Sequence, residues 1–282
     1  MLQRMLDILR TLRARRGPSV EELLAQLGHG AARQRWEAAE ALASHLTAAD
    51  VAAALVEALG DPHPFVRWQA GASLSRSGDE RVLALLLQAL ECRDSRRRSA
   101  AADALGRLGD QRATGPLCKA LTSRNVEVRC SAAEALARLG DATSLPALSK
   151  ATHDPDAGVR RLVAKALGAI EATGAVPPLL CLVQDESPLV RASAASALAK
   201  SAEGRTSGAL MPALSDSDPG VRWQVVRALE KVGGEEALPA VRGLLGDTAE
   251  VFGETIATAA RRAVEAIEAR QKPRGWLQRD RG

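Results

Sequence analysis

Cysteine and histidine, the residues that most often carry reactive or metal-binding chemistry, are few in this chain, and their spacing fits no metal site. They are Cys92, Cys118, Cys130, Cys181, His29, His45, His63 and His153. No CxxC pair and no Cys/His spacing typical of zinc occurs among them. The sequence also lacks a glycine-rich phosphate loop, a Ser-His-Asp arrangement and a paired-carboxylate cleft. We therefore expect no metal and no cofactor, name no catalytic residue, and favour a protein that is not an enzyme.

Tryptophan and basic side chains, in contrast, recur at fixed spacing and are suited to binding a partner. Trp36, Trp68 and Trp223 each directly follow an arginine. Basic residues also stand nine positions after arginines of the same series, as Arg76, Arg107, Arg138, Lys200 and Lys231. Tryptophan is a preferred anchor of protein interfaces, and positive charge selects acidic partners. The question is which elements place these residues on one surface.

The arginines belong to a repeated phrase, most complete as VRCSAAEALARLGD at residues 128–141. Its arginine returns every 31 residues, at Arg67, Arg98, Arg129, Arg160, Arg191 and Arg222, with weaker copies at Arg35 and at residues 263–267. A fixed period of this length indicates stacked supersecondary units. The composition, with 2% aromatic residues, predicts cores of Ala, Leu and Val.

Each repeat is predicted to hold a short apolar helix followed by a second helix that carries the arginine. Capping residues stand four positions before the arginine, as Asp94, Asn125, Asp156, Ser187 and Asp218. Prolines that suit a first helical position are Pro64, Pro188 and Pro219. Glycines that can end the helix in the left-handed conformation are Gly78, Gly109, Gly140 and Gly233. The repeats are therefore predicted to be helix–turn–helix units.

Helical geometry sorts the second helix into two faces. With the arginine as position zero, positions +3, +4, +7 and +10 cluster on one side and form the core, as in Ala132, Ala133, Leu136 and Leu139. Positions +1, +2, +5 and +9 point the opposite way and form an exposed stripe. The predicted partner-binding residues on this stripe are Trp36, Trp68, Gln69, Arg76, Arg107, Arg138, Arg161, Lys165, Lys200, Trp223, Gln224, Arg227 and Lys231. Two alternatives stay open: each indole packs over the next repeat, and the basic line forms a solvated ion-pair ladder with residues such as Asp103 and Glu134.

The two ends of the chain differ from the repeats. Residues 1–30 are predicted to be capping helices, one at 2–15 and one that Ser19 caps and that runs to about Gln26. Residues 31–269 form the repeats, and residues 270–282 form a basic tail that we expect to be mobile. The stretch 248–262 is too long for one turn, so it either lengthens the last helix or forms a loop beside it.

Charge is concentrated at the ends. The net charge is +4, and residues 1–16 and 270–282 each carry +4, which leaves −4 for residues 17–269. A basic groove for nucleic acid is thus not evident in the repeats as a whole. No apolar run is long enough to cross a bilayer and residues 1–16 do not read as a secretory signal, so we expect a cytoplasmic protein without a membrane span.

The phrase VRxxAAxALxxLGD with a period of 31 resembles the HEAT-like repeat of phycobilisome bilin lyases and bacterial relatives, over roughly residues 31–269. The resemblance implies an all-α, right-handed α-solenoid of about eight two-helix repeats, with the second helices lining a concave face. It also implies that the arginine pairs with acidic residues near the turns. Deoxyhypusine hydroxylases with such repeats bind iron through His-Glu motifs, and no histidine here is followed by glutamate.

The expected function is therefore binding. We expect a scaffold or assembly/adaptor factor that holds an acidic or amphipathic segment of a partner protein in the concave groove. A bilin lyase-like, chromophore-handling role is an alternative that only the resemblance suggests. Binding of nucleic acid by the basic second half of the stripe is a further alternative, because aromatic and basic residues together grip single strands.

Overall fold

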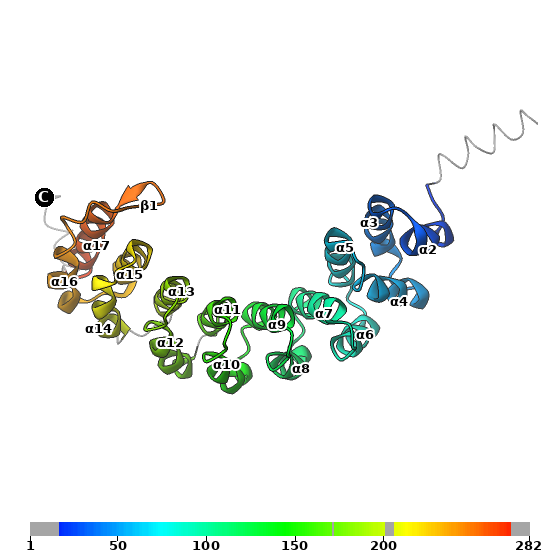
Figure 1. Cartoon of the computed structure of the whole chain (residues 1–282), viewed down its shortest axis with the longest axis horizontal. Coiled ribbons are helices and arrows are strands. Elements are labelled where there is room, and N and C mark those ends of the chain that lie inside the picture. Colours follow the sequence, from blue (N-terminus) through cyan, green and yellow to red (C-terminus); the bar gives the residue numbers. More distant parts are fainter. Residues whose placement is uncertain (1–16, 171, 201–205, 272–282) are drawn as a thin grey trace, which may run out of the picture. The chain divides into compact units, whose positions relative to one another are not determined.

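The computed structural model describes residues 17–170, 172–200 and 206–271. The predicted helix at 2–15 lies outside these residues, as does nearly all of the predicted tail. The chain forms two compact units, residues 1–135 and 136–282. Each unit is built from helix pairs, with the first helices in one layer and the second helices in the other (Figure 1).

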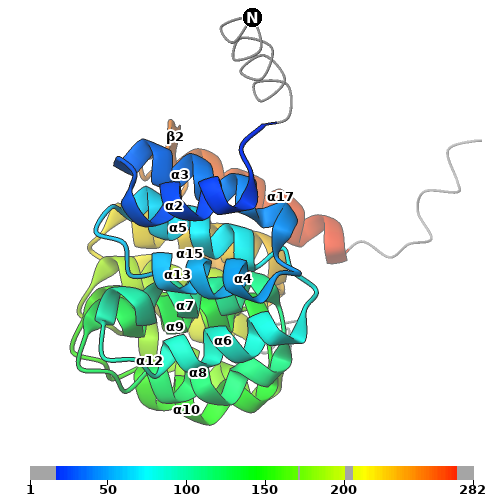
Figure 2. The same ribbon diagram turned by 90° about the vertical axis from the view of Figure 1, so that its right-hand side faces the viewer.

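The first helices of the pairs are mostly short. They are α2 (Val20–His29), α4 (Ala49–Ala58), α6 (Glu80–Leu90), α8 (Thr114–Ala120), α10 (Leu145–Ala151), α12 (Val176–Leu182), α14 (Ser207–Leu210) and α16 (Leu238–Arg242). Several adjoin a 3-10 segment, namely η2 (Gln111–Ala113), η3 (Ala142–Ser144), η4 (Thr173–Ala175), η6 (Met211–Ser215) and η7 (Glu235–Ala237). In the first unit α4, α6 and α8 pack side by side with similar axis directions (Figure 2).

The second helices carry the arginine phrase. They are α3 (Ala32–Ala41), α5 (Pro64–Leu74), α7 (Ser95–Leu108), α9 (Val126–Leu139), α11 (Ala157–Leu167), α13 (Pro188–Leu198), α15 (Pro219–Val232) and α17 (Ile256–Gln271). The 3-10 segment η1 (Leu42–His45) continues α3. Within the described residues there are thus eight helix pairs, and the prediction of an α-solenoid of about eight two-helix repeats is confirmed.

Most of the predicted helix boundaries are confirmed. The side chains of Asp94, Asp156 and Asp218 accept hydrogen bonds from the first-turn N–H groups of α7, α11 and α15. Asn125 caps α9 in the same way, through the N–H of Val128 at 3.1 Å. Ser19 and Glu22 form a capping box at the start of α2. These side chains satisfy backbone donors that have no partner inside the helix.

Three boundary residues, Ser187, Gly78 and Gly233, differ from the prediction. Ser187 precedes α13 but makes no side-chain cap; instead its N–H donates to Oδ1 of Asp185 at 2.8 Å. Gly109 and Gly140 adopt the left-handed conformation, with φ of 76° and 62°. Gly233 does not, since its φ is −65°, and Gly78 is not among the glycines with positive φ.

The core consists of Ala, Leu, Val and Ile. In α9 the predicted core residues Ala132, Ala133, Leu136 and Leu139 are all buried. Position +6, which the face assignment left out, is buried as well, as in Ala104, Ala135, Ala166, Ala197 and Ala228. At this position Ala135 and Ala197 lie against Gly106 and Gly168 of the preceding repeat, so successive second helices approach one another closely.

The repeated arginine ties adjacent repeats together. Arg160 donates through Nε and Nη2 to the carboxylate of Asp185 at 2.7 and 2.9 Å, and through Nη1 to the carbonyl of Asp154 at 2.8 Å. Arg191 repeats this arrangement with Asp216, at 2.6 and 2.7 Å. Arg35 with Asp61 and Arg222 with Asp247 are further examples. The ladder that the resemblance implied is therefore present in both units.

The ladder is interrupted in the first unit. The aspartate that accepts from Arg160, Arg191 or Arg222 stands 25 residues after that arginine. After Arg67 and Arg98 the same place holds Cys92 and Ser123, which are not carboxylates. Arg67 keeps only the backbone half of the pattern, donating to the carbonyls of Asp61 and Pro62. Nε of Arg98 is buried without a hydrogen-bond partner.

The stretch 248–262 combines the two forms considered for it. A short antiparallel hairpin, β1 (Glu250–Val251) and β2 (Glu254–Thr255), comes first. Helix α17 then begins at Ile256 and runs for 16 residues. It extends to Gln271, so Arg270 belongs to this helix and not to the tail, and its Nη1 donates to the carbonyl of Glu230 at 2.7 Å.

Candidate functional site

The three predicted tryptophans all reach the surface. The side chain of Trp68 is 52% exposed, and Trp36 and Trp223 are half-buried. None is sealed between helix pairs. Each stands at position +1, near the N-terminal end of its second helix.

In the first unit the tryptophans belong to a group that also contains a phenylalanine. His63 and Pro64 form the start of α5, and Phe65 follows with an exposed fraction of 68%. Phe65 and Trp68 are three positions apart, so they lie on the same face of α5. Trp36 occupies the corresponding place on α3, the neighbouring second helix. We call Trp36, Phe65 and Trp68 the first aromatic cluster.

The first aromatic cluster borders an open surface hollow of about 610 Å³. Its lining is Ala32, Arg33, Trp36, His63, Phe65 and Trp68. The rings of His63 and Phe65 lie 5.6 Å apart, and Nδ1 of His63 is buried without a hydrogen-bond partner. The indole N–H groups of Trp36 and Trp68 also have no acceptor among the described residues. The hollow is therefore apolar, with a few polar atoms left to satisfy.

An arginine of the next repeat holds one side of this cluster. The guanidinium of Arg107 lies over the Trp68 ring, 5.1 Å from its centroid, and also pairs with Asp103 at 2.8 Å. A cation over an indole face is attracted by the negative face of the ring. Arg107 and Asp103 thus form an ion pair, as the alternative of a solvated ion-pair ladder predicted. The other face of the Trp68 indole stays accessible.

In the second unit Trp223 is held by the hairpin. Its Nε1 donates to Oε1 of Glu254 at 2.8 Å, and its ring meets the edge of Phe252 at a centroid distance of 5.2 Å. Arg227 lies over the same indole, 5.1 Å from the centroid. The Trp223 indole therefore packs against the next repeat. This is the arrangement that the sequence left open as the alternative to a binding role. We call Trp223 and Phe252 the second aromatic cluster.

A charged network fixes that hairpin. Arg262 pairs with both Glu254, at 3.0 Å, and Glu230, at 3.1 Å. The hydrogen bond from Arg262 is the main reason that the pKa of Glu254 is held below its ordinary value; burial opposes the shift and the Trp223 indole supports it. Glu254 is therefore ionised at neutral pH and orients the indole.

The tip of the hairpin displays an aromatic side chain in an unusual backbone conformation. Phe252 has a φ of 51° and Gly253 a φ of 83°, and Phe252 is 89% exposed. Consecutive positive φ values suit a tight two-residue hairpin turn, in which Asn or Gly is normally preferred at the first place. A phenylalanine there is retained against local preference, so the position is a candidate for function.

The placement of aromatic residues is the feature that most distinguishes this surface. Every Trp and Phe of the described residues belongs to one of the two clusters, and none lies in the core. Large aromatic side chains usually contribute strongly to cores because they bury much area. Here Trp36, Phe65, Trp68 and Trp223 lie on second helices and Phe252 lies at the hairpin tip beside Trp223, where they reach the surface.

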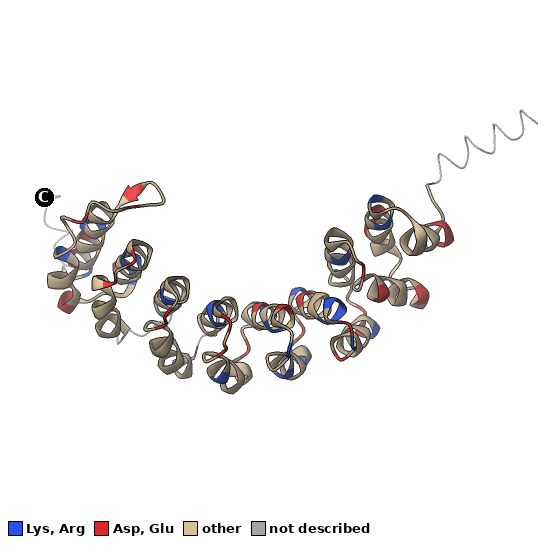
Figure 3. Ribbon diagram, in the orientation of Figure 1, with Lys and Arg blue, Asp and Glu red and all other residues tan. Residues whose placement is uncertain are grey.

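The remaining predicted binding residues are placed as follows. Gln69 is 6% exposed and donates to Ser73, whose hydroxyl in turn donates to the carbonyl of Ala39 on α3, so the prediction of Gln69 as a surface residue is wrong. Gln224, Arg107 and Arg227 are half-buried. The exposed residues are Arg76, Arg138, Arg161, Lys165, Lys200 and Lys231. Figure 3 shows basic and acidic residues interspersed along both units.

Sequence reasoning missed several residues that belong to the two clusters or contact them. They are His63, Phe65, Phe252, Glu254 and Arg262. The chain has only two phenylalanines, one beside a helix-starting proline and one beside a glycine in the predicted insertion. That scarcity was a usable signal, whereas the pairing of Glu254 with Trp223 depends on a hairpin that no sequence periodicity indicates.

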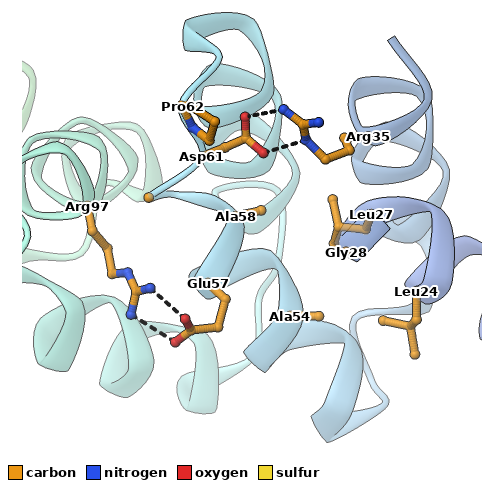
Figure 4. Close-up of a pocket in the computed structure, with 11 residues that line it drawn as sticks. Leu24, Leu27, Gly28, Arg35, Ala54, Glu57, Ala58, Asp61, Pro62 and Arg97 are labelled. Atoms are coloured by element: carbon orange, nitrogen blue, oxygen red, sulfur yellow. Dashed lines mark hydrogen bonds and ion pairs between the residues drawn. The ribbon is translucent and has the colours of Figure 1, made fainter. Parts of the chain in front are cut away.

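A second hollow in the first unit, of about 590 Å³, lies on the side of the first helices (Figure 4). Leu24, Leu27 and Ala54 form its apolar wall. Its charged groups already have partners, because Arg35 pairs with Asp61 and Arg97 with Glu57. Burial alone would raise the pKa of Asp61, but hydrogen bonds from Arg35 and the His63 N–H hold it below its ordinary value. This hollow is thus bounded by structural ion pairs.

Other kinds of site find no support in the described residues. Within them, no group of three or more His, Cys, Asp or Glu side chains could hold a metal ion. The four cysteines are free thiols. No helix among the described residues is long and apolar enough to cross a membrane.

The geometry defines a class, the helical repeat solenoids. A family model of HEAT repeats matches residues 20–106, 85–168, 148–209 and 179–265, and the chain belongs to the HEAT repeat family. Among solved structures, an engineered protein is 25% identical, with a TM-score of 0.50 over 88% of this chain and 78% of that one. Escherichia coli YibA is 19% identical, with a TM-score of 0.62 over 88% of this chain and 93% of that one.

The complex of CpcE and CpcF of phycocyanin lyase from Nostoc is also similar. It is 23% identical, with a TM-score of 0.46 over 89% of this chain and 96% of that one. A search of curated proteins by sequence finds no match. The resemblance to HEAT-like repeats is confirmed, and the likeness to these structures concerns the fold.

Proposed function

We propose that this protein is a non-catalytic scaffold that holds a segment of a partner protein on the face of its second helices. Each unit offers its own aromatic cluster as an anchor, and exposed basic residues of the second helices, such as Arg161 and Lys165, favour acidic partners. The observation that carries the proposal is that no described Trp or Phe lies in the core: four stand on second helices, and Phe252 packs from the hairpin against one of them, Trp223.

Energetics support anchors of this kind. A few Trp, Tyr and Arg residues supply most of the binding free energy of typical interfaces. Trp68 and Phe65 expose much of their rings already in the free protein, so a partner that covers them gains the burial of apolar area without moving the fold. Arg107, held against Trp68, keeps the indole in one orientation, which lowers the entropic cost of binding.

The basic residues set the expected character of the partner. Arg76, Lys200 and Lys231 are exposed at position +9; Lys231 lies on α15, and Arg76 and Lys200 lie in the turns that follow α5 and α13. Charges at the rim of an interface mainly raise the association rate and exclude partners of like charge. An acidic segment with apolar side chains is therefore the favoured partner class.

Affinity capture from the native host, read by quantitative mass spectrometry, tests the proposal. The bait is the wild-type chain, compared with a Trp36→Ala/Trp68→Ala variant and with Leu189→Ala. Leu189 is a matched control, because it is apolar and 69% exposed but belongs to neither cluster. We expect a specific protein that is reduced at least about tenfold in the tryptophan variant and retained by the control. Equal capture by all three baits would contradict the proposal.

A further inference from the structure

We propose that the first aromatic cluster binds a proline-rich segment in the polyproline II conformation, flanked by acidic residues. This inference rests on the proposed binding function and names the partner class for one of its two surfaces. It is drawn from the equivalent places of two indoles on adjacent helices, the indole donors without a described acceptor and the charge at the rim of the hollow.

The equivalent places of two indoles on adjacent helices suit a polyproline II helix. Trp36 and Trp68 occupy the same position on the adjacent helices α3 and α5. Packed helices lie roughly 8–10 Å apart, and one three-residue turn of polyproline II advances roughly 9 Å. Side chains one turn apart on such a ligand therefore meet equivalent places on the two helices. Phe65, which is 68% exposed, lines the hollow with both indoles.

The hydrogen-bonding capacity of the cluster separates this ligand from a helix. The indole N–H groups of Trp36 and Trp68 have no acceptor among the described residues, whereas Nε1 of Trp223 donates to Glu254 at 2.8 Å. Polyproline II makes no internal hydrogen bonds, so its carbonyl oxygens can accept from both indoles. An amphipathic α-helix uses its carbonyls internally and would leave both donors idle. Aromatic grooves that bind proline-rich segments use this combination of apolar slots and free donors.

The charge at the hollow sets the flanks of the ligand. Apart from His63, Arg33 is the one ionisable residue among the six that line the hollow. Its side chain is 88% exposed. Its pairing with Glu37, at 2.8 Å, is an exposed ion pair between residues four apart on α3, which contributes little and can be exchanged. Residues 1–16 of this chain carry a charge of +4 and are thereby disfavoured as the occupant.

Selection from a display library of random 12-residue peptides tests the inference. The wild-type chain is the target, and a Trp36→Ala/Trp68→Ala variant serves for counter-selection. We expect enrichment of peptides with prolines three residues apart and with Asp or Glu at one end. The enriched peptide is then titrated against the chain with indole fluorescence as the readout.

A second variant isolates the hydrogen bond. Trp68→Phe keeps an aromatic ring in the hollow and removes the donor, so it should bind the enriched peptide several-fold more weakly. Trp68→Ala should weaken binding by about tenfold or more. Circular dichroism and melting of the variants should match wild type because this side chain is largely exposed, and Leu189→Ala should bind as wild type does.

The outcomes distinguish this inference from the proposed function. Enriched peptides that depend on Trp68 but contain no proline pattern would overturn the polyproline inference and leave the binding function standing. Unchanged affinity in Trp68→Phe would overturn the role of the indole donor. Enrichment that ignores both tryptophans, or no enrichment at all, would contradict both.

Discussion

At the scale of single residues, small side chains set how closely successive second helices pack. A Cβ placed on Gly106 of α7 would lie 2.6 Å from Cα of Ala135 on α9. The same relation recurs in the second unit, where a Cβ on Gly168 would lie 2.5 Å from Cβ of Ala197. At these two junctions positions +6 and +8 therefore need small residues, a requirement that the assignment of helix faces did not reveal.

Gly106→Ala should destabilise the chain for this reason. The added methyl group meets backbone atoms that cannot move away, and overpacking of this kind costs about 1–3 kcal/mol. Thermal unfolding followed by circular dichroism measures the effect. Gly115→Ala is the control, because Gly115 lies in α8 with no atom within 4 Å of its added Cβ, and it should melt at the same or a slightly higher temperature. A Gly106→Ala protein as stable as the control would show that the close approach is absent.

Glu254 should matter for the orientation of Trp223. Glu254→Ala removes the acceptor of the Trp223 indole and one partner of Arg262. It should lower the free energy of unfolding by about 1 kcal/mol and let the indole adopt more than one orientation. The measurement is indole fluorescence, together with urea unfolding. Glu250→Ala is the matched change on the other strand, since Glu250 is exposed, and should leave both readouts unchanged. Equal effects of the two substitutions would mean that the network does not hold the hairpin.

At the scale of elements, the arginine ladder connects one repeat with the next. Burial alone would raise the pKa of Asp216, but hydrogen bonds from Arg191 and the Asp218 N–H, with the attraction of the guanidinium groups, hold it below its ordinary value. Asp185 and Asp61 are affected in the same way. The folded state therefore binds protons on these carboxylates less readily than the unfolded state does.

Stability should depend on pH accordingly. Because the folded pKa values are lowered, the stabilisation is fully present above the unfolded value of about 4 and is lost as the pH falls through the folded values. The melting temperature should thus be nearly constant from pH 7 to pH 5 and should fall below pH 4. Asp216→Asn should lower the stability at pH 7 by about 1–3 kcal/mol and therefore lower the melting temperature. On acidification the variant should lose less stability than wild type.

The exposed Glu235 provides the control for this comparison. Glu235→Gln makes the same carboxylate-to-amide change without breaking a described ion pair, and it should follow the wild-type curve. If Asp216→Asn showed the wild-type acid dependence, the ladder could not be the source of the pH effect.

Much of the element structure could be predicted because local signals agree across the repeats. Aspartate caps, prolines at the first helical position and the apolar spacing of α9 all act within a few residues of the helix that they define. The hairpin could not be predicted, since two-residue strands leave no periodic pattern and their position depends on Trp223 and Arg262. Gln69 was misplaced because its burial depends on the neighbouring repeat and not on its own helix.

At the scale of the whole molecule, stability in a repeat protein is a sum of local terms. Each repeat contacts chiefly its neighbours, so a change in one helix pair spreads only a short distance. The core supports this view, since it is a series of small aliphatic contacts between adjacent helix pairs. The binding surfaces can therefore differ between the two units while the fold stays the same.

Leu86→Ala offers a test of local stability. Leu86 is fully buried in α6, and its truncation should cost about 2–5 kcal/mol. Hydrogen exchange should become faster in α4 to α8 and stay unchanged in α13 to α17. Faster exchange throughout the chain would show that the repeats unfold as one cooperative unit.

The predicted binding residues were identified partly from the sequence and partly from the structure. Trp36, Trp68 and Trp223 could be found because helical geometry exposes position +1 in every repeat. The difference between them could not be foreseen: Trp68 borders an open hollow, whereas Trp223 is hydrogen-bonded to Glu254 and covered at one edge by Phe252. These contacts join residues 31 or fewer positions apart in sequence but in different repeats.

Hydroxyl-radical footprinting of the chain with its captured partner tests the central claim most directly. Oxidation of Trp36, Phe65 and Trp68 should fall when the partner binds, because their exposed rings become covered, while oxidation of Leu189 should stay the same. Protection of the first helices, with the oxidation of the aromatic clusters unchanged, would contradict the assignment of the second-helix face as the binding surface.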